Sequence, residues 1–190
     1  RDTHSNIMKP GLGVGGYCLT KDPYFAKFTS NKFLNNKLNF PFVDLTMKTN
    51  SKMHIRVTRN INKIIQKDHK INKILIGGIS YAENVDDIRS SRSLDMIKSL
   101  YKKKKKLTIY DPVVKLLSYK RIKIIKNSNN LKKYDLIIFN VKHKQFEKIN
   151  FSKLNNSVNI IDTNNVLSEG QIKIILKKKI KLKIIGRGDI

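Results

Sequence analysis

Apolar residues recur with a helical rhythm in the first third of the chain. Their spacing predicts one long helix from about Val43 to Asp68, in which the following apolar residues recur at roughly helical intervals: Leu45, Ile55, Val57, Ile61, Ile64 and Ile65. The pair Asp22-Pro23 predicts the start of an earlier helix, because Asp is a good N-cap and Pro fits the first helical position. We expect residues 35–41 to connect the two helices.

The pattern changes at Ile71, where short apolar runs begin to alternate with helical segments. Strands are predicted at residues 71–79, 107–110, 122–125, 136–141, 158–162 and 182–185, with a helix over residues 90–101. Such alternation is typical of βαβ units, which form a mostly parallel sheet with right-handed crossovers. The predicted fold class is therefore α/β, with a central helical linker at residues 1–70 followed by a Rossmann-like, mostly parallel sheet domain at residues 71–190.

Composition narrows the class of protein. Hydrophobic residues make up 39% of the chain, which is enough for a packed core and argues against disorder. No apolar run approaches the ~20 residues of a membrane span, so no membrane association is expected. The single cysteine cannot form an internal disulfide, which favours a reducing, cytoplasmic setting. The start at Arg1 has neither an initiator Met nor a signal peptide, and we expect an upstream part of the protein to be missing.

The net charge of +26 raises the alternative of a nucleic-acid-binding protein. Only seven of the 40 cationic residues are Arg, however, and Arg is the residue favoured for bidentate contacts to phosphates and bases. Lys, Ile and Asn, which are all abundant here, share codons rich in A and T. A biased genome therefore explains the charge better, and no nucleic-acid partner is expected.

A glycine-rich loop precedes the first predicted helix. Gly11, Gly13 and Gly16 match the spacing G-x-G-x-x-G, but no convincing strand leads into them and the helix begins only after Cys18. The dinucleotide fingerprint requires that strand–loop–helix context, so we reject it at this position. Closely spaced glycines still allow a ligand to approach the backbone.

Cys18 lies at the end of this loop, four residues before the predicted helix start at Asp22. Backbone N–H groups and the positive helix end, with Lys21 nearby, would favour the thiolate form. A lone cysteine is also commonly an inert packing residue, and Asp22 needs no role beyond that of an N-cap. Composition and spacing leave both interpretations open.

Several motifs in a fixed order resemble the UDP-glucose/GDP-mannose dehydrogenase family. In that family a Pro-Gly-rich loop leads to a Cys that is followed four positions later by Asp, as in residues 10–22 here. The Lys-Asp-Pro-Tyr sequence that follows most resembles the branch acting on UDP-N-acetylhexosamines. Later matching segments are Gly78-Ile79-Ser80-Tyr81, Asp86-Asp87-Ile88-Arg89-Ser90-Ser91, Tyr110-Asp111-Pro112, residues 135–141 with His143, and Asp162-Thr163. The resemblance covers nearly the whole chain.

The resemblance implies an NAD-dependent oxidation of a sugar primary alcohol to a carboxylate, with two hydrides passed to two NAD molecules. Cys18 would attack the intermediate aldehyde and become a thioester, which water then hydrolyses. Asp22 would activate that water or relay protons, with its N-cap position holding the carboxylate in place. The NAD-binding domain would lie upstream of Arg1, so this fragment alone is not expected to be active.

The resemblance also assigns binding residues. Val14, Gly15 and Tyr81 would contact the UDP-sugar, whereas Lys21 and Arg89 would lie near the cofactor. A local salt bridge from Arg89 to Asp86 or Asp87 is an equally good interpretation of that arginine. No cluster of His, Cys, Asp and Glu has metal-ligand spacing, so no metal is predicted.

The resemblance also implies a homodimer, in which two copies of the chain pair through the central helix over residues 43–68. His143 is expected to be a loop or surface histidine. Ala82 replaces the basic residue that many members carry after the tyrosine, and His4 lies roughly where an arginine is usual. These departures leave open a degenerate, non-catalytic relative that binds nucleotide-sugars.

Overall fold

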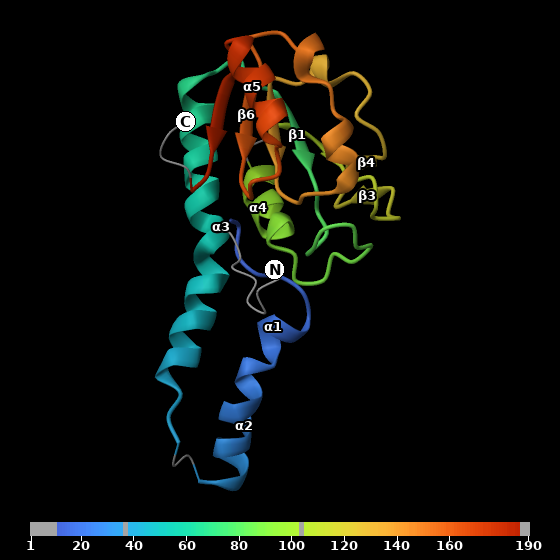
Figure 1. Ribbon diagram of the computed structural model, residues 1–190. Coiled ribbons are helices and arrows are strands. Elements are labelled where there is room, and N and C mark those ends of the chain that lie inside the picture. Colours follow the sequence, from blue (N-terminus) through green and yellow to red (C-terminus); the bar gives the residue numbers. More distant parts are fainter. Residues whose placement is uncertain (1–10, 36–37, 103–104, 187–190) are drawn as a thin grey trace, which may run out of the picture.

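The computed structural model describes residues 11–35, 38–102 and 105–186. The first helices form an elongated hairpin that extends away from the α/β part of the molecule (Figure 1). Its elements are α1 (Cys18–Lys21), α2 (Pro23–Phe33) and the long α3 (Pro41–Lys67). An ion pair of 2.7 Å between Lys27 Nζ and Asp44 Oδ2 joins α2 to α3. The bounds of α3, Pro41–Lys67, confirm the predicted helix over residues 43–68 to within two residues.

A seven-stranded sheet forms the second part of the molecule. The strand order is β3-β4-β2-β1-β5-β6-β7, and every pairing is parallel except that of β3 with β4. The strands are β1 (Lys73–Gly77), β2 (Lys106–Tyr110), β3 (Ser118–Tyr119), β4 (Ile122–Ile125), β5 (Leu136–Phe139), β6 (Asn159–Asp162) and β7 (Lys181–Ile184). The predicted Rossmann-like, mostly parallel sheet is therefore confirmed.

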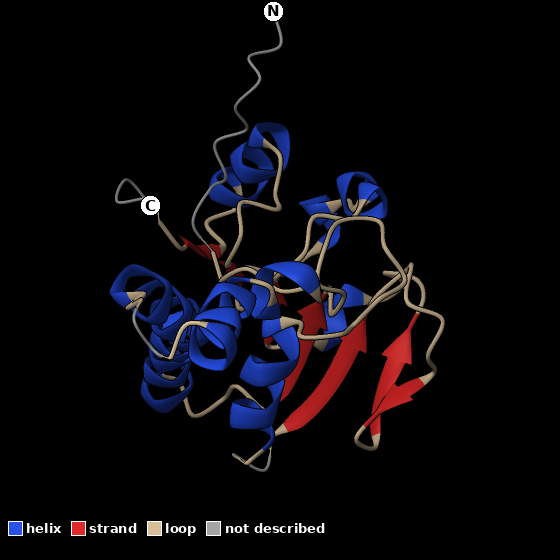
Figure 2. Ribbon diagram, turned by 90° about the horizontal axis from the view of Figure 1, so that it is seen from below, coloured by secondary structure: helices blue, strands red, loops and turns tan. Residues whose placement is uncertain are grey.

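Helices cover both faces of this sheet (Figure 2). On one face, α4 (Arg92–Tyr101) and the second half of α3 share a core with alternate strand residues such as Ile74 and Ile76. On the other face, Leu75 and Ile137 pack in the core beneath α5 (Glu169–Lys177). The remaining helical turns are η1 (Leu131–Lys133), η2 (Lys144–Lys148) and η3 (Phe151–Lys153). Strands buried on both faces explain why the sequence shows short continuous apolar runs here.

The strand order places a topological switch point at the centre of the sheet. From β1, the chain passes through α4 to β2 on one side, whereas β5 pairs with the other side of β1. The loops that leave the carboxyl ends of β1 and β5 therefore diverge and leave a crevice between them. Ligands of open α/β sheets characteristically bind in this crevice.

Candidate functional site

A cavity of about 760 Å³ lies at the carboxyl ends of β1, β5 and β6. Its walls come from five segments of the sequence: the glycine-rich loop, α3, the β1–α4 connection with the start of α4, the residues that follow β5, and a residue that follows β6. Val14, Gly15 and Tyr81 all line it, so the three residues expected to contact a substrate are brought together. Tyr81 is more than 60 positions from Val14 and Gly15 in the sequence, and only the fold brings it to them.

Asn50 on α3 holds the glycine-rich loop in place. The Val14 N–H donates to Asn50 Oδ1 at 2.7 Å, and Asn50 Nδ2 donates to the Val14 carbonyl at 2.9 Å. The neighbouring Gly13 has a φ of +107°, and an added Cβ would lie 2.9 Å from Asn50 Oδ1. Glycine is therefore required here both for its backbone conformation and for the close approach of α3.

Tyr81 packs directly on the backbone of the same loop. A Cβ added at Gly15 would lie 3.1 Å from Tyr81 Cβ, and one added at Gly16 would lie 2.9 Å from the tyrosine ring. A side chain at Gly16 would displace the ring, and one at Gly15 would collide with the Ser90 carbonyl, 2.8 Å from the added Cβ, and with Tyr81 Cβ. The glycines thus seat Tyr81 against the loop, where its side chain remains 39% exposed.

Cys18 is the first residue of α1, and its side chain is exposed. It is not among the residues that line the cavity, although the next residue, Leu19, is. Thr20 Oγ1 fixes the turn by donating to the Gly16 carbonyl at 2.6 Å. The thiol therefore lies beside the cavity, at the outer end of the loop.

Asp22 occupies the N-cap position of α2 but does not cap it with its side chain. Its backbone is already helical, with φ −62° and ψ −31°, because its N–H donates to the Cys18 carbonyl. The carboxylate instead pairs with Lys21 Nζ at 2.5 Å. The expectation that capping holds this carboxylate is wrong, and the ion pair with Lys21 takes that role.

Lys21 and Arg89 meet at the ring of Tyr17. Lys21 Nζ lies 4.6 Å and the Arg89 guanidinium 5.5 Å from the ring centroid. Arg89 also forms a forked ion pair with Asp87, with Nη2 at 2.7 Å and Nε at 2.9 Å from Oδ2. This hydrogen-bonded pair raises the pKa of Arg89 and lowers that of Asp87. The local salt bridge is thus present, and the fold also brings Arg89 beside α1.

His143 lies in the loop between β5 and η2, as expected of a loop histidine, but it is fully buried and not on the surface. Its Nδ1 accepts the Asn84 N–H at 3.0 Å, which places the ring proton on Nε2, 3.3 Å from Asp111 Oδ2. Burial raises the pKa of Asp111, but hydrogen bonds from His143, Ile79 and Val114 outweigh burial and lower it to about 2. The histidine therefore ties together the loops that follow β1, β2 and β5.

Several polar residues that line the cavity were not predicted from the sequence, among them Asn50, Arg92 and Asn140. Asn50 gives no signal in the sequence, because its role arises only where α3 crosses the loop. Arg92 begins α4 and Asn140 directly follows β5. A residue just beyond a predicted parallel strand faces the ligand-binding edge of the sheet, so Asn140 could have been proposed from the sequence.

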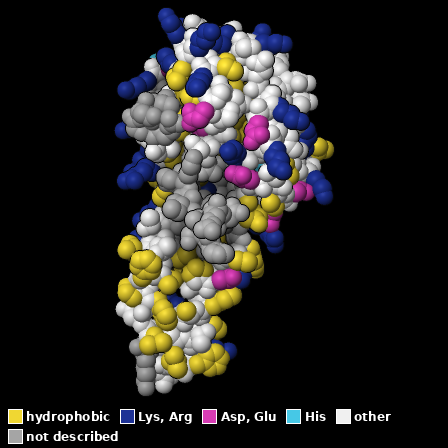
Figure 3. Space-filling view, viewed as in Figure 1, with side chains coloured by type: hydrophobic (Ala, Val, Ile, Leu, Met, Phe, Trp, Pro, Cys, Tyr) yellow, Lys and Arg dark blue, Asp and Glu magenta, His cyan; other side chains and the backbone are white. Residues whose placement is uncertain are grey.

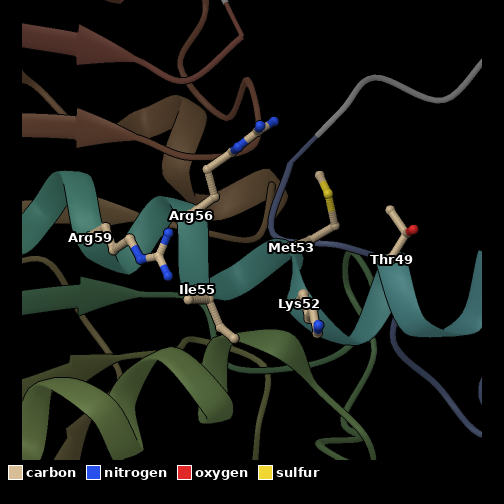
Figure 4. A pocket seen from close by; sticks show the side chains of 6 residues that line it. All are labelled: Thr49, Lys52, Met53, Ile55, Arg56 and Arg59. Carbon is tan, nitrogen blue, oxygen red and sulfur yellow. The ribbon is translucent and has the colours of Figure 1, made fainter.

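A second hollow of about 490 Å³ lies along α3 and shares Thr49 and Met53 with the cavity. Figure 4 shows Lys52, Arg56 and Arg59 leaving α3 on successive turns around it. None of these three cations forms an ion pair with another residue of the described ranges. This hollow is cationic, whereas the cavity is mostly apolar.

No group of three or more His, Cys, Asp or Glu side chains among the described residues could hold a metal ion. None of the helices in the same part of the chain combines the length and apolar character needed to cross a membrane. His4, whose position differs from the family pattern, lies outside the described residues.

Comparison with known proteins gives consistent matches. Residues 75–169 match the model of the UDP binding domain of the UDP-glucose/GDP-mannose dehydrogenase family. A UDP-N-acetyl-D-mannosamine dehydrogenase of Methanocaldococcus jannaschii is 30% identical over 96% of this chain and 41% of its own length. The chain therefore spans about two fifths of the length of the curated relatives it matches.

Solved structures agree with these sequence matches. A UDP-D-ManNAc dehydrogenase from Pyrococcus horikoshii superimposes with a TM-score of 0.72 and 26% identity, covering 98% of this chain and 42% of that one. The UDP-N-acetyl-mannosamine dehydrogenase Cap5O from S. aureus gives a TM-score of 0.65 and 29% identity, covering 87% of this chain and 38% of that one.

Proposed function

Because the chain belongs to the UDP-glucose/GDP-mannose dehydrogenase family, we propose that it is the C-terminal part of an NAD-dependent UDP-sugar 6-dehydrogenase. The proposed substrate is a UDP-hexose, most closely a UDP-N-acetylhexosamine, whose C6 alcohol becomes a carboxylate. One observation carries the proposal: Val14, Gly15 and Tyr81 converge on a single cavity at the switch point of the sheet. The nucleotide-sugar occupies that cavity, with the loop backbone along the sugar and Tyr81 against the nucleotide.

Cys18 is the nucleophile of this proposal. Removal of a hydride and a proton converts the alcohol to an aldehyde, and the Cys18 sulfur then adds to the aldehyde carbon to form a hemithioacetal. Loss of a second hydride and a proton leaves a thioester. Water hydrolyses the thioester to the carboxylate and frees the thiol. The exposed position of Cys18 beside the cavity leaves its sulfur accessible to a sugar that extends from the cavity mouth.

Asp22 and Lys21 support that chemistry as a pair. The Asp22 carboxylate is the proposed base that activates the hydrolytic water, four residues along the chain from the nucleophile. Its ion pair with Lys21 holds it in place. The hydrogen bond to Asp22 raises the pKa of Lys21, so the lysine stays charged through the neutral range.

Lys21 and Arg89 fit one side of a cofactor site. Both cations lie on the Tyr17 ring, and their side chains are 37% and 68% exposed, which leaves N–H donors available to phosphate oxygens. The chemistry that NAD supplies when bound is hydride acceptance. The rest of that site is proposed to lie in an upstream domain, which would place the cofactor next to Cys18.

In the proposed assembly each chain has two domains, and two chains form a homodimer. Residues 1–70 carry the cysteine loop and the central helical dimerisation region, and residues 71–190 form the UDP-sugar-binding domain. The homodimer forms through the central helix, at the end where apolar side chains are exposed. We place the enzyme in the cytoplasm, where the single cysteine stays reduced.

Two observations favour a second candidate function. Cys18 does not line the cavity, and the residue after Tyr81 is the uncharged Ala82. A non-catalytic relative that binds nucleotide-sugars would keep the cavity and dispense with the thiol. The two candidates differ in whether Cys18 is needed for turnover.

NADH formation in the protein that includes the upstream domain tests the proposal. We expect two NADH for each UDP-N-acetylhexosamine oxidised, and none from residues 1–190 alone. Cys18→Ser should still bind the UDP-sugar but should not complete the second oxidation. Turnover by the serine variant at the wild-type rate would exclude Cys18 as the nucleophile. Binding without any turnover in the wild-type protein would instead favour the non-catalytic relative.

A further inference from the structure

Arg92 is the only Lys or Arg among the described residues that line the cavity. It is the first residue of α4, a helix of ten residues whose N-terminal residues Ser91 and Ser93 also line the cavity. The unpaired N–H groups and the dipole at a helix N-terminus favour an anion. The cavity thus carries its positive charge at a single place, where α4 begins.

The guanidinium of Arg92 is held in position by two hydrogen bonds, but some of its N–H donors have no partner. Nε donates to the Val14 carbonyl at 3.2 Å, and Nη1 donates to Asp95 Oδ2 at 3.2 Å. Nη2 has no hydrogen bond to a described residue. Asp95 shares its charge with Lys98 Nζ at 2.9 Å, so it does not neutralise Arg92 alone. The side chain is only 15% exposed, and its free donors are therefore available mainly to a ligand in the cavity.

Asn140 provides a second, independent indication of a ligand. The residue directly follows β5, is only 1% exposed, and lines the cavity. Since Ile138 packs on the face of the sheet that α3 and α4 cover, the alternation of the strand aims Asn140 to the same side. Thr163 Oγ1 bonds one amide atom at 2.9 Å, and the other has no partner.

An unpaired buried amide atom is costly, and native proteins normally give it a partner. Oxygen and nitrogen of an amide are assigned from their hydrogen bonds, but either assignment leaves one polar atom of Asn140 unpaired. A polar ligand atom in the cavity would satisfy it. Asn140 follows β5, whereas α4 follows β1. Two separate parts of the cavity wall therefore indicate the same ligand.

We propose that Arg92 binds the diphosphate of a nucleoside diphosphate sugar in this cavity, and that the free amide atom of Asn140 contacts a polar group of the same ligand. This inference rests on the proposed function and adds the residues that orient the ligand. The diphosphate lies at the start of α4, where the helix N-terminus and the guanidinium act together. Among the described residues, the other charged side chain that lines the cavity is Glu83, so Arg92 alone supplies positive charge to an anionic ligand there.

Calorimetric titration of UDP and of uridine into residues 1–190 tests the role of Arg92. We expect Arg92→Gln to weaken UDP binding by about ten- to a hundredfold, because a hydrogen bond to a charged group is lost. Uridine, which has no phosphate, should bind the variant and the wild type alike. The matched control is Lys98→Gln. It also removes one positive charge that pairs with Asp95, but Lys98 lies outside the cavity. That control should bind UDP like the wild type.

A second pair of variants tests Asn140. Asn140→Ala should weaken UDP binding by about two- to tenfold, because a neutral hydrogen bond is lost. Thr163→Val removes the same Thr163–Asn140 hydrogen bond but leaves the amide in the cavity, so it should bind UDP like the wild type. Melting temperatures of all four variants identify any that fail to fold. If Arg92→Gln or Asn140→Ala fails to fold, the other of the two tests whether the ligand occupies the cavity.

The outcomes separate the two proposals. If the wild type binds UDP and Arg92→Gln binds it equally well, the diphosphate assignment is overturned but the proposed function stands. Equal weakening by Lys98→Gln overturns it as well, because the effect is then one of net charge. An unchanged Asn140→Ala, or equal losses in Asn140→Ala and Thr163→Val, overturns the role of the amide. No UDP binding by the wild-type chain overturns the proposed function and this inference together.

Discussion

At the residue scale, the buried pair of Asp111 and His143 shows how polar groups position the loops of the cavity. Asp111 accepts N–H bonds from Ile79, Val113 and Val114, and His143 accepts one from Asn84. Both side chains are fully buried. Because Tyr81 follows Ile79 by two residues, the pair fixes the start of the segment that carries the tyrosine.

The pKa of Asp111 predicts a pH-dependent contribution to stability. Its folded pKa, about 2, lies below the ordinary aspartate value of 3.8, so its stabilisation is complete above about pH 4 and is lost as the pH falls toward 2. Asp111→Asn should lower the free energy of unfolding by about 2 kcal/mol at pH 7, since one pKa unit corresponds to ~1.4 kcal/mol. Urea unfolding at several pH values measures this difference, which should shrink between about pH 4 and pH 2.

A surface carboxylate serves as the control for that measurement. Asp44 forms a half-exposed ion pair with Lys27, so Asp44→Asn should change the free energy of unfolding by less than ~1 kcal/mol. If the loss in Asp111→Asn were the same at pH 2 and at pH 7, the ionised carboxylate would not be the stabilising group.

At the element scale, the outward face of α3 changes character along its length. Its N-terminal end exposes Phe42 (79%) and Leu45 (63%). Farther along, the exposed face carries cations at intervals of three or four residues: Lys48, Lys52, Arg56, Arg59, Lys63 and Lys67. Figure 3 shows the same division, with hydrophobic side chains over the helical hairpin and Lys and Arg over the α/β part.

This division sharpens the proposed homodimer. Two copies that met along the cationic stretch would bring like charges together, whereas the apolar end would bury exposed aromatic and aliphatic surface. The double variant Phe42→Ser, Leu45→Ser should therefore be monomeric at concentrations where the wild type is a dimer. Light scattering after size-exclusion chromatography measures this. The double variant Lys52→Ser, Lys63→Ser, on the same helix face, should remain a dimer.

Two results would contradict the placement of that interface. A dimer that survives the loss of Phe42 and Leu45 would lie elsewhere on the molecule. A dimer that is lost only in the lysine variant would need the cationic stretch, and an anion between the two copies.

Most elements could be predicted from the sequence, and the misses have physical causes. β4 matches its predicted range, and the helix over residues 90–101 is observed as Arg92–Tyr101. Residues 71–79 form a shorter strand, because the positive φ of Gly78 ends it. α5 was missed although Ser168 and Gln171 form a capping box, which is a readable signal. β3 has two residues and exists only by pairing with β4.

The candidate site was predictable only in part, and by motif more than by physics. Val14, Gly15 and Tyr81 followed from the order of family-like segments, and the fold places them in one cavity. Asn50 and Arg92 contact the Val14 backbone from two different helices. Such contacts depend on how the helices cross, which no local pattern in the sequence records.

At the scale of the whole molecule, two hollows compete for an anionic ligand. The cavity at the switch point is lined by Arg92, Glu83 and Tyr81. The hollow on α3 is lined by Lys52, Arg56 and Arg59 and does not lie at the edge of the sheet (Figure 4). A net charge of +26 attracts any phosphate to the surface, so binding alone does not locate the ligand. Shape and polar complementarity favour the cavity.

The most direct measurement is a crystal structure of residues 1–190 with UDP bound. We expect the nucleotide in the cavity between Val14 and Tyr81, with its diphosphate at the start of α4. UDP bound in the hollow of Lys52, Arg56 and Arg59, with the cavity empty, would contradict the account.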